Sequence, residues 1–281
     1  MIAYYKEDVF LIIRGLTAPI IFISPFVFGL YEGYEVLIVL MIWLLLNDIN
    51  HVLHLHTHKP FAKNYFLNLV LDISMSIVTG MTAYNWRIQH KYRHHVPDKE
   101  DFGEGYSWEI EKFSIMGSFV YSVRTIFPII FLPIIEAFHK GILKNQKQPI
   151  HYRIAFFEQF IPFIAFILFL MWNQSLALYY VLPWYFLVHF VTRYIDYLNH
   201  FGTVNGKFSH SNNSLHKVYN KLGNNFGYHT AHHLYPSAHW TELPKIHKEI
   251  ENEIDPKYLK SYSWSGFAIF SHYLLSLKSK M

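Results

Sequence analysis

The chain has 281 residues, of which 52% are hydrophobic and 16% charged, with a net charge of +4. Soluble globular proteins carry about 25% charged residues, so this deficit and long apolar runs such as Ile161–Trp172 exclude a disordered chain and argue against a soluble enzyme. There is no cysteine, which excludes disulfides, iron–sulfur clusters and cysteine-bound zinc, while the 19 histidines stand out against 20 aspartates and glutamates.

Six apolar stretches are candidate membrane segments. A helix rises about 1.5 Å per residue, so about 20 residues cross a bilayer core of ~30 Å. We expect the first stretch to be a span and not a cleaved signal peptide, because no small-residue cleavage site follows it. In chain order, the stretches are Val9–Leu30, Val36–Val52, Tyr65–Tyr84, Phe113–Ile135, Phe156–Trp172 and Ser175–Tyr197.

Nearly every Lys and Arg lies in particular connections between these stretches. The loop Tyr31–Glu35 and the turn Asn173–Gln174 have no Lys or Arg. By the positive-inside rule, the basic connections and both termini are expected on the cytoplasmic side. The small net charge is therefore attributed to membrane orientation, and no nucleic acid is expected as a partner. The basic connections are Lys59–Lys63, Arg87–Lys112, Lys140–Arg153 and the tail after His200.

This sidedness limits the number of crossings. Only Tyr65–Tyr84 separates the cytoplasmic histidines His54–His58 from His90–His95, so we expect this stretch to re-enter or to lie in the interface. Between His95 and His200, the stretch Phe113–Ile135 is expected not to cross. It contains Arg124, and a charged residue that faces lipid costs at least ~2.5 kcal/mol.

The expected fold class is all-α. We predict an integral membrane protein with about four transmembrane helices in two hairpins, further interfacial helices and a cytoplasmic histidine-rich helical cap, forming one domain over residues 1–281. The apolar stretch Ser265–Leu277 is too short to cross, so we expect a helix on the membrane surface.

Polar side chains recur at helical spacing in four clusters on the predicted cytoplasmic side. A lone histidine at a membrane interface is usually a satisfied polar residue, but crowded imidazoles must stay neutral or repel one another. Neutral imidazole is the commonest metal ligand, and residues four apart share a helix face. The clusters are Asn47, His51, His54 and His58; His90, His94 and His95; His189, Arg193, Asp196 and His200; and His229, His232 and His233.

Nine of these histidines are the predicted metal-ligating and catalytic residues. A tetrahedral zinc ion takes four ligands, so nine nitrogens suit two ions better than one. Nitrogen-rich sites with an open position suit iron that reacts with oxygen, although ligand type alone leaves zinc, copper and manganese open. The nine are His54, His58, His90, His94, His95, His200, His229, His232 and His233.

Three clusters resemble the histidine boxes of the membrane fatty acid desaturase and hydroxylase superfamily. The resemblance runs from about Leu45 to Ile250 and includes Trp86, which opens the second box. It implies two non-haem irons bound by histidine, O2 as oxidant and co-substrate, and a long acyl or alkyl chain, as a lipid or thioester. The boxes are His54-x-x-x-His58, His90-x-x-x-His94-His95 and His229-x-x-His232-His233.

Some features depart from the acyl desaturases. The second box has three residues before its histidine pair, where many acyl desaturases have two. The segment Asp196–Gly202 resembles a motif of the alkane monooxygenases, as does Gly103–Tyr106. We therefore expect desaturation of a fatty acyl chain, with hydroxylation of a fatty acyl or alkyl chain as the alternative. A metal transporter is a remote alternative, and a non-catalytic scaffold would be expected to have lost some of the nine histidines.

The electrons must come from another protein, because the chain has no cysteine for an iron–sulfur cluster and no nucleotide-binding fingerprint. The expected donor is of the ferredoxin, rubredoxin or cytochrome b5 type. Two basic clusters either steer an acidic carrier or only orient the protein in the membrane. They are Arg87, Lys91 and Arg93, and Lys140, Lys144 and Lys147.

Four carboxylates are predicted to orient the metal ligands, since metal-bound histidine usually donates its other ring hydrogen to a carboxylate or a carbonyl. They are Asp48, Asp72, Asp101 and Asp196, the last of which has Arg193 as an alternative partner. His51 and His56 could replace an assigned ligand, and His189 is expected to pack or to form a hydrogen bond.

Overall fold

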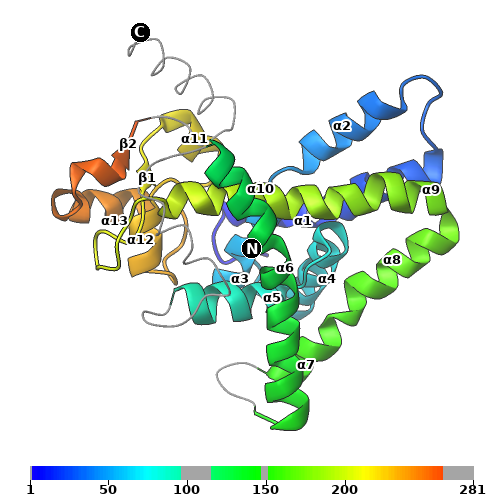
Figure 1. Ribbon diagram of the computed structural model, residues 1–281, viewed down its shortest axis with the longest axis horizontal. Helices are drawn as coiled ribbons and strands as arrows, with labels where there is room; N and C mark the ends of the chain where they lie inside the picture. Colours follow the sequence, from blue (N-terminus) through cyan, green and yellow to red (C-terminus); the bar gives the residue numbers. More distant parts are fainter. Residues whose placement is uncertain (1, 96–114, 147–150, 262–281) are drawn as a thin grey trace. The chain divides into compact units, whose positions relative to one another are not determined.

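The computed structural model describes residues 2–95, 115–146 and 151–261 (Figure 1). These residues are mostly helical, and the expected all-α membrane architecture is confirmed. One pair of short parallel strands accompanies the helices, β1 (Asn213–Ser214) and β2 (Leu259–Lys260). The expected surface helix Ser265–Leu277 and the motif Gly103–Tyr106 lie outside the described residues.

Helices make up most of the described residues. In the first part of the chain they are α1 (Asp8–Phe28), α2 (Glu35–Leu46), α3 (Ile49–His58), α4 (Tyr65–Thr79), α5 (Ala83–Trp86) and the π-helix η1 (Arg87–His94). Then come α6 (Ile115–Ala137), η3 (Phe138–Leu143), α7 (Tyr152–Glu158), α8 (Phe160–Trp172), α9 (Gln174–Leu176), η4 (Ala177–Val181) and α10 (Leu182–His200). The last are α11 (Lys217–Leu222), α12 (His229–Leu234), α13 (Leu243–Ile250), η5 (Glu251–Glu253) and η6 (Pro256–Tyr258).

The chain folds into two compact units. Unit 1 comprises residues 1–103 and 124–192, and unit 2 comprises residues 104–123 and 193–281. The helices α6 and α10 contribute residues to both units. The expectation of one domain over the whole chain stays a prediction.

Five helical segments are long and apolar enough to cross a membrane. Four of them correspond to the four expected spans. The fifth contains α6, which was expected not to cross, so the number of crossings stays a prediction. The five segments are Asp8–Phe28, Glu35–His58, Met116–Leu143, Tyr152–Trp172 and Gln174–His200.

The stretch between the first two histidine boxes is bent. Helices α4 and α5–η1 meet at 89°, and Gly80 at the bend has a φ of +71°. A Cβ at Gly80 would lie 2.8 Å from the ring of Tyr185, so both the left-handed backbone and the close approach require glycine. The 15 residues of α4 span about 22 Å, less than a bilayer core. This geometry fits the expected re-entrant or interfacial stretch.

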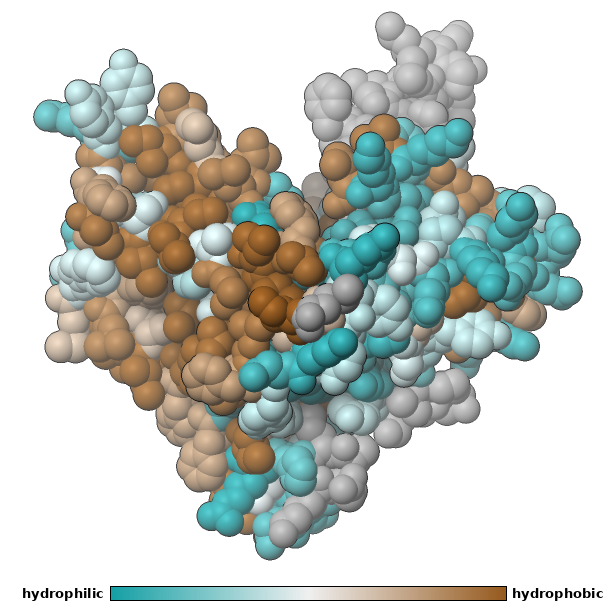
Figure 2. Space-filling view, turned by 180° about the vertical axis from the view of Figure 1, so that it is seen from behind, coloured by the Kyte–Doolittle hydropathy of each residue, from teal (hydrophilic) through white to brown (hydrophobic). Residues whose placement is uncertain are grey.

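Large apolar side chains are exposed over the helices of unit 1. Phe28, Met171 and Tyr179 expose 85%, 78% and 79% of their surface, and Figure 2 shows apolar side chains gathered over a continuous area of one face. Exposed apolar area on this scale is unfavourable in water and is typical of a surface that faces lipid acyl chains.

In unit 2, side-chain amides hold the segments around α12 together. Asn213 on β1 accepts a hydrogen bond from the backbone N–H of Thr230 at 3.0 Å and donates one to its hydroxyl at 2.8 Å. Asn220 likewise accepts from the backbone N–H of Gly227 at 2.9 Å. Because all these groups are buried, the first turn of α12 has a fixed position on β1.

Candidate metal centre

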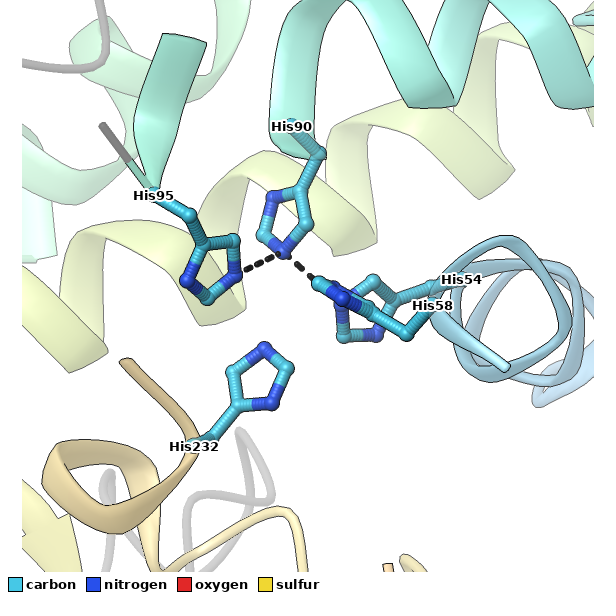
Figure 3. Close-up of side chains that lie close together, drawn as sticks. All are labelled: His54, His58, His90, His95 and His232. Carbon is cyan, nitrogen blue, oxygen red and sulfur yellow. Dashed lines mark hydrogen bonds between the residues drawn. The ribbon is translucent and has the colours of Figure 1, made fainter. Parts of the chain in front are cut away.

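Four imidazoles from two helical segments converge in unit 1. His54 and His58 lie one turn apart on α3, and His90 and His95 lie on η1 and at its C-cap. One ring nitrogen of each lies within 4.8 Å of those of the others, and Figure 3 shows these rings turned toward one another. The Nε2–Nε2 distances are 3.0 Å for His58 and His54, 2.8 Å for His54 and His90, and 2.9 Å for His95 and His90.

Hydrogen bonds alone do not account for this arrangement. A neutral imidazole nitrogen carries either one hydrogen or one lone pair, so it makes one good hydrogen bond. Three Nε2–Nε2 contacts run in series through four nitrogens, and at most two of them can be good hydrogen bonds at once. Four lone pairs directed at a common cation satisfy all four nitrogens, so this donor set fits a metal ion.

The π-helix explains the long spacing of the second box. The backbone N–H of His95 bonds to the carbonyl oxygen of His90 at 3.1 Å, the i→i−5 pattern of a π-helix. A π-helix is rare and frequently marks a functional site. It brings His90 and His95 together, while the ring of His94 stacks on that of His90 with centroids 4.9 Å apart.

A second group lies in unit 2. The Nε2 of His229 lies 3.2 Å from that of His200 and 3.1 Å from that of His233. The middle nitrogen again faces two others, so both contacts cannot be good hydrogen bonds. His229 and His233 are one turn apart on α12, and His200 ends α10.

The ring of His200 is oriented by a backbone carbonyl. Its Nδ1 lies 2.8 Å from the carbonyl oxygen of His210, and a carbonyl only accepts, so Nδ1 carries the hydrogen. The lone pair of the neutral ring is therefore on Nε2, the atom that faces His229. A hydrogen bond of this kind sets the tautomer and direction of metal-binding histidines. No residue pattern signals this bond, because the acceptor is a backbone atom ten residues away.

Seven of the nine predicted histidines thus fall into two groups, four of them in unit 1 and three in unit 2. The other two, His94 and His232, are buried and lie on the same helical segments as members of these groups. The ring of His232 lies 5.6 Å from that of His229.

Three of the four carboxylates predicted to orient the ligands have arginine partners. The Nε of Arg14 donates to Asp48 at 3.0 Å. The Nη2 of Arg193 lies 2.5 Å from Asp196, which also accepts from the hydroxyl of Tyr121. A distance of 3.9 Å separates a carboxylate oxygen of Asp196 from the Nε2 of His200, beyond hydrogen-bond reach.

Asp72 also has an arginine partner, Arg87, at 3.1 Å. Its other oxygen lies 3.4 Å from the Nε2 of His56, a histidine outside both groups. His56 and Asp72 therefore link α3 to α4 and do not orient any of the nine histidines directly. The fourth predicted carboxylate, Asp101, lies outside the described residues.

Other predicted polar residues have clear partners. His189 forms the expected hydrogen bond, from its Nε2 to the carbonyl oxygen of Thr79 at 2.9 Å. His51 lies with its ring 5.8 Å from that of His54 but is not among the four converging histidines of unit 1.

The predicted basic clusters are partly neutralised. Arg87 pairs with Asp72, while Arg93 and Lys140 both pair with Glu136. These three side chains are therefore poor candidates for a surface that attracts an acidic carrier. Lys147 lies outside the described residues.

Comparison with known families agrees with this geometry. The family model described as fatty acid desaturase matches residues 33–266, which includes all nine histidines. No curated protein and no solved structure matches the chain. The family match and the candidate spans together show that the protein is an integral membrane oxidoreductase of the desaturase and hydroxylase type. The chain belongs to the fatty acid desaturase family.

Proposed function

We propose that the protein uses two histidine-bound iron ions and O2 to desaturate a long-chain fatty acyl group. The observation that carries this proposal is the convergence of His54, His58, His90 and His95, whose ligand atoms lie within 4.8 Å of one another. Their contacts exceed what hydrogen bonding can satisfy, and the family match supports chemistry on fatty acyl chains.

Each group provides ligands for the proposed iron, and His94 and His232 are proposed as further ligands. Iron held by nitrogen ligands supplies the redox chemistry by which O2 attacks an unactivated carbon–hydrogen bond. The protein supplies ligand orientation and a dry environment. His200 is held in the tautomer that presents Nε2 by its bond to the carbonyl of His210.

Aromatic side chains shield both groups from water. The indole of Trp86 lies 5.4 Å from the ring of His54 and 5.5 Å from that of His90. In unit 2, the ring of Phe226 lies 5.2 Å from that of His229. Such shielding limits the access of water to a reactive site.

The proposed substrate is a long acyl chain carried by a membrane lipid or a thioester, and the exposed apolar face of unit 1 supports access from the bilayer. We propose that the histidines and both termini lie on the cytoplasmic side. The electrons are proposed to come from a separate carrier of the ferredoxin, rubredoxin or cytochrome b5 type, because a chain without cysteine holds no iron–sulfur cluster.

Hydroxylation of a fatty acyl or alkyl chain is the second candidate. The observation that favours it is the segment Asp196–Gly202, which resembles an alkane monooxygenase motif and leads into the unit 2 group through His200. Both reactions begin with removal of one hydrogen. Loss of a second hydrogen gives a double bond, whereas addition of oxygen gives an alcohol, and the placement of the chain decides between them.

The test combines metal analysis with lipid analysis. We expect the purified protein to bind about two iron ions, and the His90→Ala variant to lose most of this iron. Cells that express the wild-type protein with a suitable electron donor should accumulate acyl chains lacking two hydrogens, as measured by mass spectrometry. Chains with one added oxygen would instead establish hydroxylation.

His139→Ala is a matched control, because His139 is exposed on η3 and belongs to neither group. It should keep both the iron and the lipid product. Stoichiometric zinc in the wild type and in His90→Ala would contradict the proposed site. Iron binding with no lipid product, together with metal movement across proteoliposomes, would support a transporter instead.

A further inference from the structure

Two residues link the helices that carry the unit 1 histidines. Asn50 lies four residues before His54 on α3, and Trp86 lies four residues before His90, at the junction of α5 and η1. The indole N–H of Trp86 donates to the side-chain oxygen of Asn50 at 3.1 Å. The two helices are thus joined one turn away from the Nε2 atoms of His54 and His90, which are only 2.8 Å apart.

The link continues to a third helix. The amide nitrogen of Asn50 donates to the hydroxyl of Thr192 at 2.6 Å, and this hydroxyl donates to the carbonyl oxygen of Val188 at 2.7 Å. All three hydrogen bonds run in the same direction: the indole donates to the amide, the amide to the hydroxyl and the hydroxyl to the carbonyl. This series of bonds therefore fixes the orientation of the Asn50 amide, and each bond strengthens its neighbours.

The network is buried among apolar side chains. Asn50 and Trp86 expose 2% and 5% of their surface, and Ile49, Val52 and Leu53 beside Asn50 expose none. A buried amide without partners costs about 1–3 kcal/mol, so α3 and α5–η1 favour the one relative position that satisfies Asn50.

The indole also contacts the histidines directly. Its ring lies 5.4 Å from that of His54, tilted by 38°, and 5.5 Å from that of His90, nearly perpendicular at 74°. Trp86 therefore borders the nitrogen pair of His54 and His90 and is itself held by Asn50.

We propose that Trp86 and Asn50 are positioning residues that set the separation of α3 and η1, and so the distance between the nitrogens of His54 and His90. Thr192 anchors this pair to α10. The inference rests on the proposed function, because its consequence is the affinity and geometry of metal binding at the unit 1 histidines.

The test is the pair Trp86→Phe and Trp184→Phe. Each substitution keeps an aromatic ring and removes one buried indole hydrogen bond, since the N–H of Trp184 donates to the carbonyl oxygen of Val78 at 2.8 Å. Loss of a residue that orients a metal ligand lowers metal affinity by about 10–100-fold. We expect a loss of this size for Fe²⁺ in Trp86→Phe and wild-type affinity in Trp184→Phe.

A second measurement separates positioning from general stability. Cobalt(II) bound in place of iron has visible absorption bands that depend on ligand geometry. These bands should shift in Trp86→Phe and stay unchanged in Trp184→Phe, with both proteins folded by circular dichroism. If Trp86→Phe does not fold, Thr192→Val serves instead, because it removes the hydroxyl that anchors Asn50 while keeping the side-chain shape.

The possible results separate a failure of the positioning role from a failure of the proposed function. Absence of metal from the wild-type protein would contradict the proposed function. A wild-type protein that binds two ions, with unchanged affinity and spectrum in Trp86→Phe, would overturn only the positioning role. Equal losses in Trp86→Phe and Trp184→Phe would overturn it as well, because the effect would then come from general packing.

Discussion

The Nε2 atoms of His90 and His95 lie 2.9 Å apart, although five positions separate the two residues in the sequence. In an α-helix, residues five apart point about 140° away from each other. The π-helix Arg87–His94 reduces this difference, so the two histidines stay together despite the extra residue in the second box.

This relationship predicts opposite effects of shortening and lengthening the second box. Deletion of Lys91 gives a spacing of four, which a regular α-helix places on one face. Insertion of one alanine after Lys91 gives a spacing of six, which neither helix type accommodates. We expect the deletion variant to keep most of its iron and the insertion variant to lose it, as measured by metal analysis of the purified proteins.

A matched insertion after His139 in η3 controls for the general effect of an added residue and should leave the iron content unchanged. Retention of iron by the variant lengthened after Lys91 would show that the π-helix has no part in bringing His90 and His95 together.

A second prediction concerns the ion pair of Asp72 and Arg87, which joins α4 to η1. Their side chains expose only 10% and 18% of their surface, so Asp72→Asn leaves a mostly buried guanidinium without the carboxylate that it pairs with. We expect a loss of about 2–3 kcal/mol, seen as a fall of about 5–10 °C in the thermal unfolding midpoint in detergent.

The exposed pair of Asp255 and Lys257 provides the control, because its side chains expose 51% and 62% of their surface. Asp255→Asn should change the midpoint very little. Adding Arg87→Met to Asp72→Asn should recover part of the lost stability, since it removes the unpaired charge. A double variant less stable than Asp72→Asn would contradict this explanation.

A third prediction concerns His247 on α13, which is buried and packs against Tyr228 with ring centroids 4.9 Å apart. Desolvation by burial lowers the pKa of His247 below its usual 6.5, although the charge of Glu251 acts in the opposite direction. The unfolded chain therefore binds a proton more readily than the folded one. Stability should fall as the pH drops below about 6.5 and level off below the lowered pKa.

His247→Phe keeps the ring contact and removes the titrating group. In metal-free protein, the unfolding midpoint of this variant should depend less on pH between 7 and 5 than that of the wild type. Every other histidine is present in both proteins, so the difference reports on His247. Equal slopes would contradict the assignment.

Spacing in the sequence was sufficient to predict which histidines share a helix face, as for His54 and His58, because helical periodicity is a local property. It was not sufficient for the π-helix, since a shift of one residue in backbone hydrogen bonding has no side-chain signature. The pairing of Asp196 with Arg193, three positions away, was foreseen as an alternative, but the partners of Asp48 and Asp72 were hidden. Asp48 pairs with Arg14, 34 positions away, and only the packing of α1 decides this choice. The contact between Asn50 and Trp86 has the same origin.

The last prediction concerns the crossings. The chain has no cysteine, so single cysteines at exposed positions report their side of the membrane by labelling with an impermeant reagent in intact cells. We expect Glu32→Cys to be labelled from outside, and Lys144→Cys and Lys257→Cys only after the cells are opened, because α6 does not cross in the proposed arrangement.

A crossing by α6 would reverse the last two results together. Lys144 would then lie outside, the hairpin of α8 and α10 would return the chain to the same side, and Lys257 would be labelled from outside as well. The first two histidine boxes and the third would lie on opposite sides of the bilayer. Labelling of both cysteines from outside would therefore contradict the proposed cytoplasmic location of all nine histidines, whereas labelling of neither supports it.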